Sequence, residues 1–475
     1  MTSAPSTAPT DDAAPTRYRE IVGLALPAMA SGFVWVAYHW INQIWVGRMG
    51  GHGSAPVAAL SVAVFGTWAF GALSGLAGTG LNALVGRYVG AGRPAAASYV
   101  ATHGLRFAAA FGALVGLVGI FIAPKLAAWS DVGPEAAAMS TGYLRAFYAA
   151  GFAALTQGAA DSVFRGHGDT RTPFLVAVAT LSTNALLDPI LIFGAGPVPA
   201  LGVTGAGIAS AIAATGGAVA SVWRLHRRGF LSTVRPPDAE LKLVESTPIA
   251  PGPLRALDLS VVRRVGRVGV PTSLQGLIFV AIYFMLARIV TKAGGDDAIA
   301  GLGAGLRGEQ VAYFLGLGFM VAAASLVSRR LGAHRPRDAQ RCAVRCSMLA
   351  SAGCLAWGTL LYVLADALAA LFIESGSPAA RAHAADFYRI VAPCLMFQAW
   401  EHVLEGAFAG AGLTWPPMIS SVLLTVIRIP IARWAAFDLG AGVRGIWVVI
   451  AVTAALRGVF LAIWFARGTW KTRRV

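Results

Sequence analysis

Long apolar stretches follow one another along this chain, and short polar segments separate them. Each stretch is long enough to cross about 30 Å of hydrocarbon as a helix. The stretches lie at residues 20–47, 57–86, 98–123, 140–164, 172–195, 202–224, 262–292, 298–328, 342–373, 384–408, 415–436 and 443–466. This pattern predicts an all-α integral membrane protein with twelve transmembrane helices.

The composition supports a membrane protein and argues against the partner that the net charge would otherwise suggest. Hydrophobic residues make up 56% of the 475 residues and charged residues 13%, whereas a soluble chain is about 25% charged. A net charge of +16 would suggest nucleic acid binding in a soluble protein. Lys and Arg instead concentrate in the polar segments 87–106, 165–171, 224–267 and 329–345. By the positive-inside rule these segments are cytosolic, so we expect both termini in the cytosol and no nucleic acid partner.

The chain repeats itself at an offset of 242 to 244 residues. The repeated features are LVGRYVGAGRP (84–94) and LVSRRLGAHRP (326–336), FRGHGDTRTP (164–173) and FAGAGLTWPP (408–417), and Pro27 and Pro271. Each half carries six predicted spans, an even number, so both halves enter the membrane in the same orientation. We therefore predict two pseudo-symmetric six-helix bundles, related as a parallel repeat about an axis along the membrane normal.

The composition between these bundles predicts the division of the chain. The first residues are small and polar, typical of a disordered tail, and the segment between the halves is rich in Pro and charge, typical of a linker. We expect a cytosolic N-terminal tail at 1–19, an N-lobe at 20–226, a cytosolic linker at 227–258, a C-lobe at 259–470 and a cytosolic C-terminal tail at 471–475.

Four motifs carry a resemblance to a known family. They are INQIWVGRMGG (41–51), LVGRYVGAGRP (84–94), RGHGDTRTPF (165–174) and TNALLDPILIFG (183–194). With the duplicated spans, they resemble the multidrug and toxic compound extrusion (MATE) family over residues 20–470, and the last motif looks most like its DinF branch. The resemblance implies a V-shaped pair of six-helix bundles. It also implies an antiporter that expels cationic or amphipathic compounds in exchange for protons or sodium ions.

Asp188 is the first candidate for coupling that exchange. It lies inside the apolar span 172–195, where a charge costs about 2.5–3.5 kcal/mol on insertion scales. Asn184 lies one helical turn away on the same face. Pro189 can kink the helix, so Pro189 and Pro27 are candidate hinges. The structural alternative is an aspartate that hydrogen bonds neutralise and that only fixes helix packing.

The first span offers Tyr38 and Asn42, which are also one turn apart. In the DinF branch the position of Asn42 usually holds an aspartate, so this chain lacks one of the two N-lobe acids that the resemblance implies. A carboxamide does not titrate, but it can hydrogen-bond Asp188 or offer its oxygen to an ion. By the same resemblance Tyr143 could donate a hydrogen bond there, and Asn42 could instead be a packing amide.

Asp161 stands where members of the family often carry asparagine. We expect it near the inner end of its span, as an acid that attracts a cationic substrate or as a partner of Arg165. By the same resemblance, Ser210 or Thr204 could supply a hydroxyl from the sixth span to the coupling site.

The C-lobe has its own charged residues inside predicted spans. Glu401 and Glu405 share a helix face, and Glu309 lies in the eighth span. Arg428 pairs with Glu309 or Glu405 in this interpretation, which would make that acid a poorer proton carrier. These four residues are candidates for the substrate cavity, and a buried structural ion pair is the alternative for Glu309 and Arg428.

The sequence predicts a transporter rather than an enzyme. It has no HExxH, GxSxG or Walker motif in a suitable setting, and neither the cysteines nor His402 predict a metal site. We expect no cofactor other than H⁺ or Na⁺ as the coupling ion, and a monomer in the plasma (inner) membrane of a bacterium. The alternative is a flippase or exporter of a lipid-linked or amphipathic metabolite, but the acids inside the spans favour cationic cargo.

Overall fold

The structure is a computed structural model, and it describes residues 18–49, 55–130, 132–241, 257–373 and 377–472. Most of the predicted N-terminal tail and the middle of the predicted linker lie outside the described residues. Tyr18 and Arg19, which the prediction assigned to the tail, belong to the first helix instead. Lys471 and Thr472, assigned to the C-terminal tail, lie in a 3₁₀ turn.

The regular secondary structure of the described residues is helical, apart from one isolated bridge between Ala195 and Val198. The first half holds α1 (Tyr18–Gly47), α2 (Ala55–Gly90), α3 (Pro94–Ala128), α4 (Pro134–Ala149), α5 (Gly151–Gly166), α6 (Arg171–Phe193), α7 (Gly202–Arg227) and the short α8 (Asp238–Leu241). The second half holds α9 (Leu259–Gly332), α10 (Pro336–Val363), α11 (Ala365–Phe372), α12 (Pro378–Val391), α13 (Leu395–Gly410), α14 (Trp415–Arg433) and α15 (Gly442–Ala466). The all-helical class is thereby confirmed.

Among the described helices, 9 are long and apolar enough to cross a membrane. The other predicted spans correspond to helices that are divided or merged. The segments α4 and α5 are separated at Ala150, and α12 and α13 by the 3₁₀ turn Ala392–Cys394. One helix, α9, covers two predicted spans. The number of twelve spans stays a prediction.

The long helix α9 reverses direction at residues 294–295, where the backbone is not helical. A straight helix of its 74 residues would be about 110 Å long. Its two ends instead lie against the same part of α2: Gly80 contacts Val265 near the start of α9, and Gly90 contacts Arg329 near its end. The second residue of the turn has φ 64°, a conformation that favours glycine.

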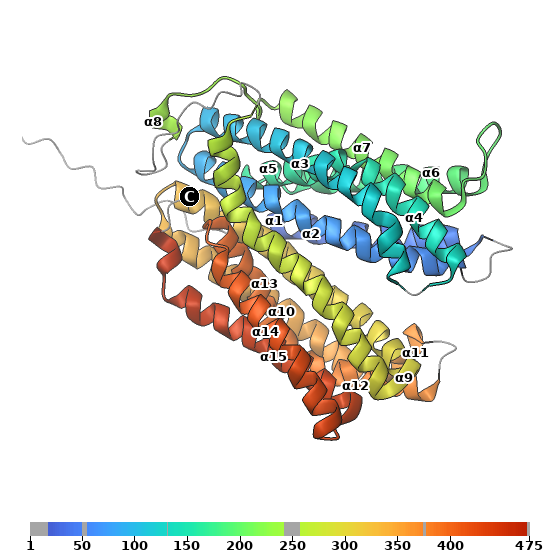
Figure 1. Cartoon of the computed structure of the whole chain (residues 1–475). Helices are drawn as coiled ribbons and strands as arrows, with labels where there is room; N and C mark the ends of the chain where they lie inside the picture. Colours follow the sequence, from blue (N-terminus) through green and yellow to red (C-terminus); the bar gives the residue numbers. More distant parts are fainter. Residues whose placement is uncertain (1–17, 50–54, 131, 242–256, 374–376, 473–475) are drawn as a thin grey trace, which may run out of the picture.

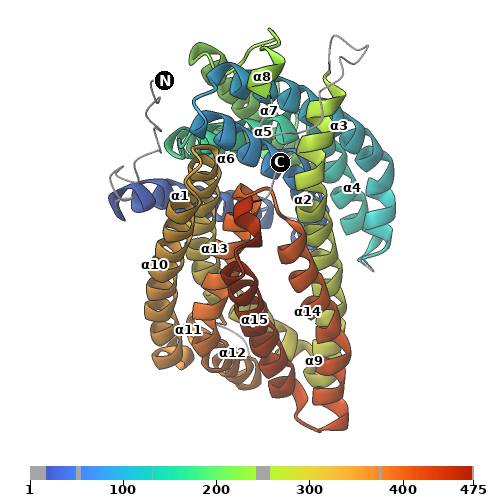
Figure 2. The ribbon, with the colours of Figure 1, turned by 90° about the vertical axis from the view of Figure 1, so that its left-hand side faces the viewer.

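The two halves of the chain form two lobes (Figure 1). Helices α1–α7 make the N-lobe, and α9–α15 make the C-lobe. The lobes meet at one end, near α8 and the last described residues after α15, and diverge towards the other end, which gives a V shape (Figure 1). Figure 2 views the molecule from the end where the lobes meet. Contacts between the lobes are made mainly by α1 and α2 with α9. We call the end where the lobes meet the junction end.

Candidate functional site

Asp188 of α6 is fully buried in the N-lobe, and its side chain faces α1. Asn184, one turn earlier in α6, donates from Nδ2 to Asp188 Oδ1 at 3.2 Å. The Asn42 amide of α1 is oriented by its partners, so that its nitrogen donates to Asp188 Oδ2 at 2.8 Å and Oδ1 at 3.3 Å. The carboxylate is 0% exposed and therefore does not face lipid. The helix continues through Pro189 to Phe193.

Hydroxyl groups from two further helices complete this cluster. Ser210 of α7 places its Oγ 3.5 Å from Asn184 Nδ2. The phenol groups of Tyr38 and Tyr143 lie beside Ser210 and are close enough to Asp188 to be influenced by its charge. Thr204, the alternative to Ser210, lies against Gly142 of α4. We call this set the Asp188 cluster; its residues are Tyr38, Asn42, Tyr143, Asn184, Asp188 and Ser210.

A pocket reaches the Asp188 cluster from within the N-lobe. It encloses about 430 Å³ with its opening included. The lining residues come from α1, α2 and α4: His39, Asn42, Gln43, Leu60, Ser61, Ala63, Val64, Thr67 and Tyr143. Since Asn42 and Tyr143 line the pocket and also belong to the cluster, a small ion in the pocket is one side chain away from Asp188.

Asp161 does not join the Asp188 cluster, whose described contacts come from α1, α4, α6 and α7. It lies in α5, and Arg165 is the charged group that influences it electrostatically. Its Oδ1 has no hydrogen-bond partner in the described residues. Asp161 and Asp188 therefore occupy separate environments.

The motif RGHGDTRTPF forms the turn between α5 and α6. Asp169 accepts hydrogen bonds from the Thr172 amide at 2.9 Å and from the Thr172 hydroxyl at 2.6 Å. Arg228, at the end of α7, lies 2.5 Å from Asp169 Oδ2. Burial alone would raise the pKa of Asp169, but the hydrogen bonds from Thr172 and Arg228 outweigh it and lower the pKa. This charged turn fixes the start of α6 relative to α7.

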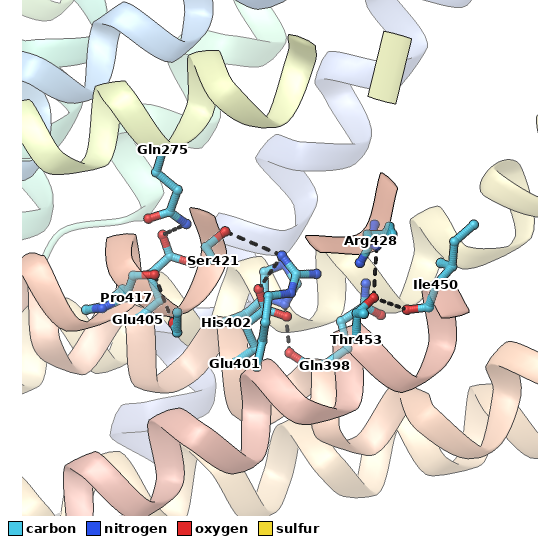
Figure 3. Close-up of polar contacts among 12 residues, drawn as sticks. Gln275, Gln398, Glu401, His402, Glu405, Pro417, Ser421, Arg428, Ile450 and Thr453 are labelled. Carbon is cyan, nitrogen blue, oxygen red and sulfur yellow. Dashed lines mark hydrogen bonds and ion pairs between the residues drawn. The ribbon is translucent and has the colours of Figure 1, made fainter. Parts of the chain in front are cut away.

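The C-lobe acids take separate partners (Figure 3). Glu401 of α13 forms an ion pair with Arg457 of α15, at 2.9 Å. Both are buried, at 5% and 6% exposed. Glu405, one turn further along α13, accepts a hydrogen bond from Gln275 of α9 at 3.0 Å. Glu401 thus has a cationic partner, whereas Glu405 has a neutral one.

Arg428 does not pair with Glu309 or Glu405 in the described hydrogen bonds and ion pairs, so neither predicted alternative is present. Its Nε donates to Thr453 at 2.9 Å, and its guanidinium lies 5.8 Å from the centre of the Tyr283 ring. Glu309 instead accepts from Gln398 at 2.7 Å.

The sequence analysis missed Arg457 as the partner of Glu401. Its position inside the apolar span 443–466 was the available signal. The pairing itself depends on how α13 faces α15, which spacing along one helix does not report. Within the part of the chain that the structure describes, no group of three His, Cys, Asp or Glu side chains lies close enough to hold a metal ion.

Comparison with known proteins gives the family. The MatE family model matches residues 27–190 and 271–434, one match in each half. This double match confirms the duplication. A probable multidrug resistance protein NorM of Thermotoga maritima is 24% identical over 96% of this chain and 94% of its own length. An FAD transporter of Shewanella oneidensis is 26% identical over 62% of this chain and 61% of its own.

Solved structures share the fold. A MOP superfamily transporter from Pyrococcus furiosus, described as having a binding pocket of reverse polarity, superimposes with a TM-score of 0.84 at 21% identity, over 96% of this chain and 97% of that one. An outward-facing multidrug resistance MATE family transporter gives a TM-score of 0.82 at 22% identity, over 96% of each chain. On the two matched repeats and this shared architecture, the chain belongs to the MatE family of membrane transporters.

Proposed function

We propose that this protein is a secondary antiporter that exports cationic or amphipathic small molecules, drugs among them, in exchange for H⁺ or Na⁺. It works as a monomer in the plasma (inner) membrane of a bacterium, with both termini and the junction end in the cytosol. Relatives named as multidrug resistance proteins support this substrate class. The stretch TNALLDPILIFG supports a DinF-like subtype.

The observation that carries the proposal is the buried and uncompensated carboxylate of Asp188. The residue is 0% exposed, and its described hydrogen-bond partners are the amides of Asn184 and Asn42. A buried charge without an opposite charge is costly. A proton or a sodium ion removes that cost, so the site favours binding one of them.

The other members of the Asp188 cluster position that ion. Asn184 and Asn42 hold the carboxylate by hydrogen bonds when it is ionised. The oxygens of Tyr38, Tyr143 and the amides are hard ligands that suit Na⁺ if the coupling ion is sodium. The pocket beside Asn42 is the route by which the ion reaches the site.

Three other acids, Asp161, Glu405 and Glu309, attract the organic cation in this proposal. Asp161 and Glu405 occupy equivalent positions in the two repeats, 244 residues apart, and their described hydrogen-bonding partners are neutral or absent. When the lobes rock between the two access states, with Pro27 and Pro189 as hinges, these carboxylates attract a positively charged substrate. Glu309 of the C-lobe adds to this attraction for a positively charged substrate.

A second candidate function is export of an anionic or lipid-linked amphipathic metabolite. The observation that favours it is the pair Arg428 and Arg457, two arginines buried inside the C-lobe at 0% and 6% exposure. The FAD transporter among the relatives is consistent with such cargo. Competition by FAD for export of the cationic dye in the assay below separates the two candidates.

The test is export of a fluorescent cationic dye from proteoliposomes under an imposed pH or Na⁺ gradient. We expect Asp188→Asn to lower gradient-driven export by at least about tenfold, because an amide neither takes up a proton nor supplies a charge to Na⁺. Asp366→Asn is the control, since that side chain is 77% exposed. Full export by Asp188→Asn would remove Asp188 from coupling, and the gradient that drives the wild type identifies the ion.

A further inference from the structure

Helices α2 and α9 cross at the junction end with their backbones in contact. A Cβ added at Gly90 of α2 would collide with the carbonyl oxygen of Arg329, and one added at Gly332 of α9 would collide with the carbonyl oxygen of Arg87. These contacts are reciprocal, because both pairs of equivalent residues are 242 positions apart. Only glycine permits this approach of two backbones.

The pseudo-symmetry axis passes through this crossing. A Cβ added at Gly86 would collide with Ser328 Oγ, and Ser328 is the equivalent of Gly86 in the second repeat. A residue that contacts its own equivalent lies beside the axis that relates the two lobes. At this crossing the backbones of the two lobes are therefore in direct contact beside the axis.

An arginine of each repeat reaches across this crossing to the other lobe. Arg87 of α2 donates to the carbonyl oxygen of Ala411, in the turn after α13, at 2.8 Å. Arg329 of α9 lies over Gly168, in the turn after α5. A Cβ added to Gly168 would be 2.7 Å from Nη1 of Arg329. Arg329 also lies 3.7 Å from Glu20 of α1. The two turns are equivalent segments of the repeats.

A further contact beside the crossing occurs once in each repeat. Arg330 of α9 forms an ion pair with Glu20 of α1 at 3.3 Å. In the equivalent place Arg264 of α9 donates to the hydroxyl of Tyr88 of α2 at 3.4 Å. Each contact joins one lobe to the other, although the chemistry differs: an ion pair in one and a guanidinium–phenol hydrogen bond in the other.

We propose that these contacts form an arginine latch, which holds the junction end closed and opens when the lobes part on that side. The latch consists of Arg87 with Ala411 and Arg329 with Gly168 and Glu20, on the crossing of Gly90 and Gly332. The inference rests on the proposed alternating access. A guanidinium that leaves a backbone carbonyl is rehydrated at small net cost, so the closure is reversible.

The first test separates the crossing without removing a charge. Spin labels go on Ala95→Cys and Arg337→Cys, two exposed equivalent positions, in a Cys394→Ala background; the other native cysteines are buried. We expect Gly90→Ala with Gly332→Ala to add a population at longer label-to-label distance. The control is Gly23→Ala with Gly266→Ala, where an added Cβ meets nothing within 4 Å.

The second test removes the arginines and adds no volume. Arg87→Gln with Arg329→Gln should produce the same longer-distance population. Arg227→Gln is the control, because that arginine contacts Trp223 of its own helix. An unchanged distance distribution in both latch variants, or an equal shift in the controls, would overturn the latch.

A covalent lock covers the case in which the variants do not fold. A reducible bifunctional thiol reagent, of a length chosen from the label-to-label distance, can link Ala95→Cys to Arg337→Cys in the same background. This cross-link should abolish dye export, and reduction should restore it. Full export by the cross-linked protein would contradict the inference. The distance measurement needs neither gradient nor substrate, so failure of the latch is distinguishable from failure of Asp188→Asn to lose export.

Discussion

At the scale of the residue, Asn42 sets the number of carboxylic acids in the Asp188 cluster. Its amide lies 2.8 Å from Asp188 Oδ2, the place where the family resemblance implies a second carboxylate. Two carboxylates at that separation do not both ionise at neutral pH. With an amide there, the Asp188 cluster has a single carboxylic acid, and under the proposed antiport it would exchange one monovalent cation.

We therefore expect Asn42→Asp to increase proton coupling. One acid of the new pair would keep a proton on the acidic side of the membrane and release it inside, so proton movement per exported dye molecule should rise. A pH-sensitive dye enclosed in the proteoliposomes measures that ratio. Gln43→Glu adds the same charge at an exposed position of the pocket; an equal ratio in both variants would contradict the role of Asn42.

At the scale of the element, the turn inside α9 shows how closely hydropathy locates a break. The apolar pattern predicted spans at 262–292 and 298–328, and the structure reverses the chain between them, at residues 294–295. The pattern did not reveal that helical hydrogen bonding continues on both sides with so short a turn. The backbone of Gly295, with φ 64° and ψ −154°, makes this possible.

We expect Gly295→Ala to destabilise the protein by about 1–3 kcal/mol, because this backbone conformation is essentially restricted to glycine. The measurement is thermal unfolding in detergent, followed by circular dichroism. Gly303→Ala is the matched control: it lies in the same helix, and an added Cβ there meets nothing within 4 Å. Equal thermal unfolding midpoints for the two variants would show that a side chain at position 295 does not strain the turn.

Other helix breaks had no signal in the hydropathy pattern. The interruption at Ala150 lies where Gly151 of one helix and Gly112 and Gly116 of another bring two backbones together. This contact depends on residues about 40 positions apart, which a local apolar pattern does not report. The same holds for the division between α12 and α13, although Pro393 there removes a backbone donor.

At the scale of the whole molecule, the two lobes share a fold but not their chemistry. Asn184 beside Asp188 corresponds to Arg428 in the C-lobe, and Asp188 corresponds to Ala432, at the same offset of 244 residues. A buried guanidinium thus lies in the C-lobe near the place where the N-lobe holds a buried carboxylate. The ion pair Arg457–Glu401 balances part of the remaining C-lobe charge.

Breaking the ion pair between Arg457 and Glu401 should destabilise the folded protein. We expect Glu401→Gln to lower the free energy of unfolding by about 3–5 kcal/mol, because it leaves the charge of Arg457 buried without a partner. Glu405→Gln should have a much smaller effect, since Glu405 contacts the neutral Gln275. Denaturation in detergent measures both. Adding Arg457→Leu to Glu401→Gln should recover most of the loss; no recovery would show that the pair matters through another contact.

The sequence by itself determined the membrane class, the duplication and the position of Asp188 as an acid inside an apolar span. Hydropathy over some 20 residues reports immersion in lipid, and repeated motifs are visible without a structure. Only the tertiary structure decided which neutral groups surround Asp188, that Arg457 and not Arg428 meets an acid, and that Arg87 and Arg329 cross between lobes. Those contacts join helices far apart in the chain, and they depend on how helices pack and which rotamers fit.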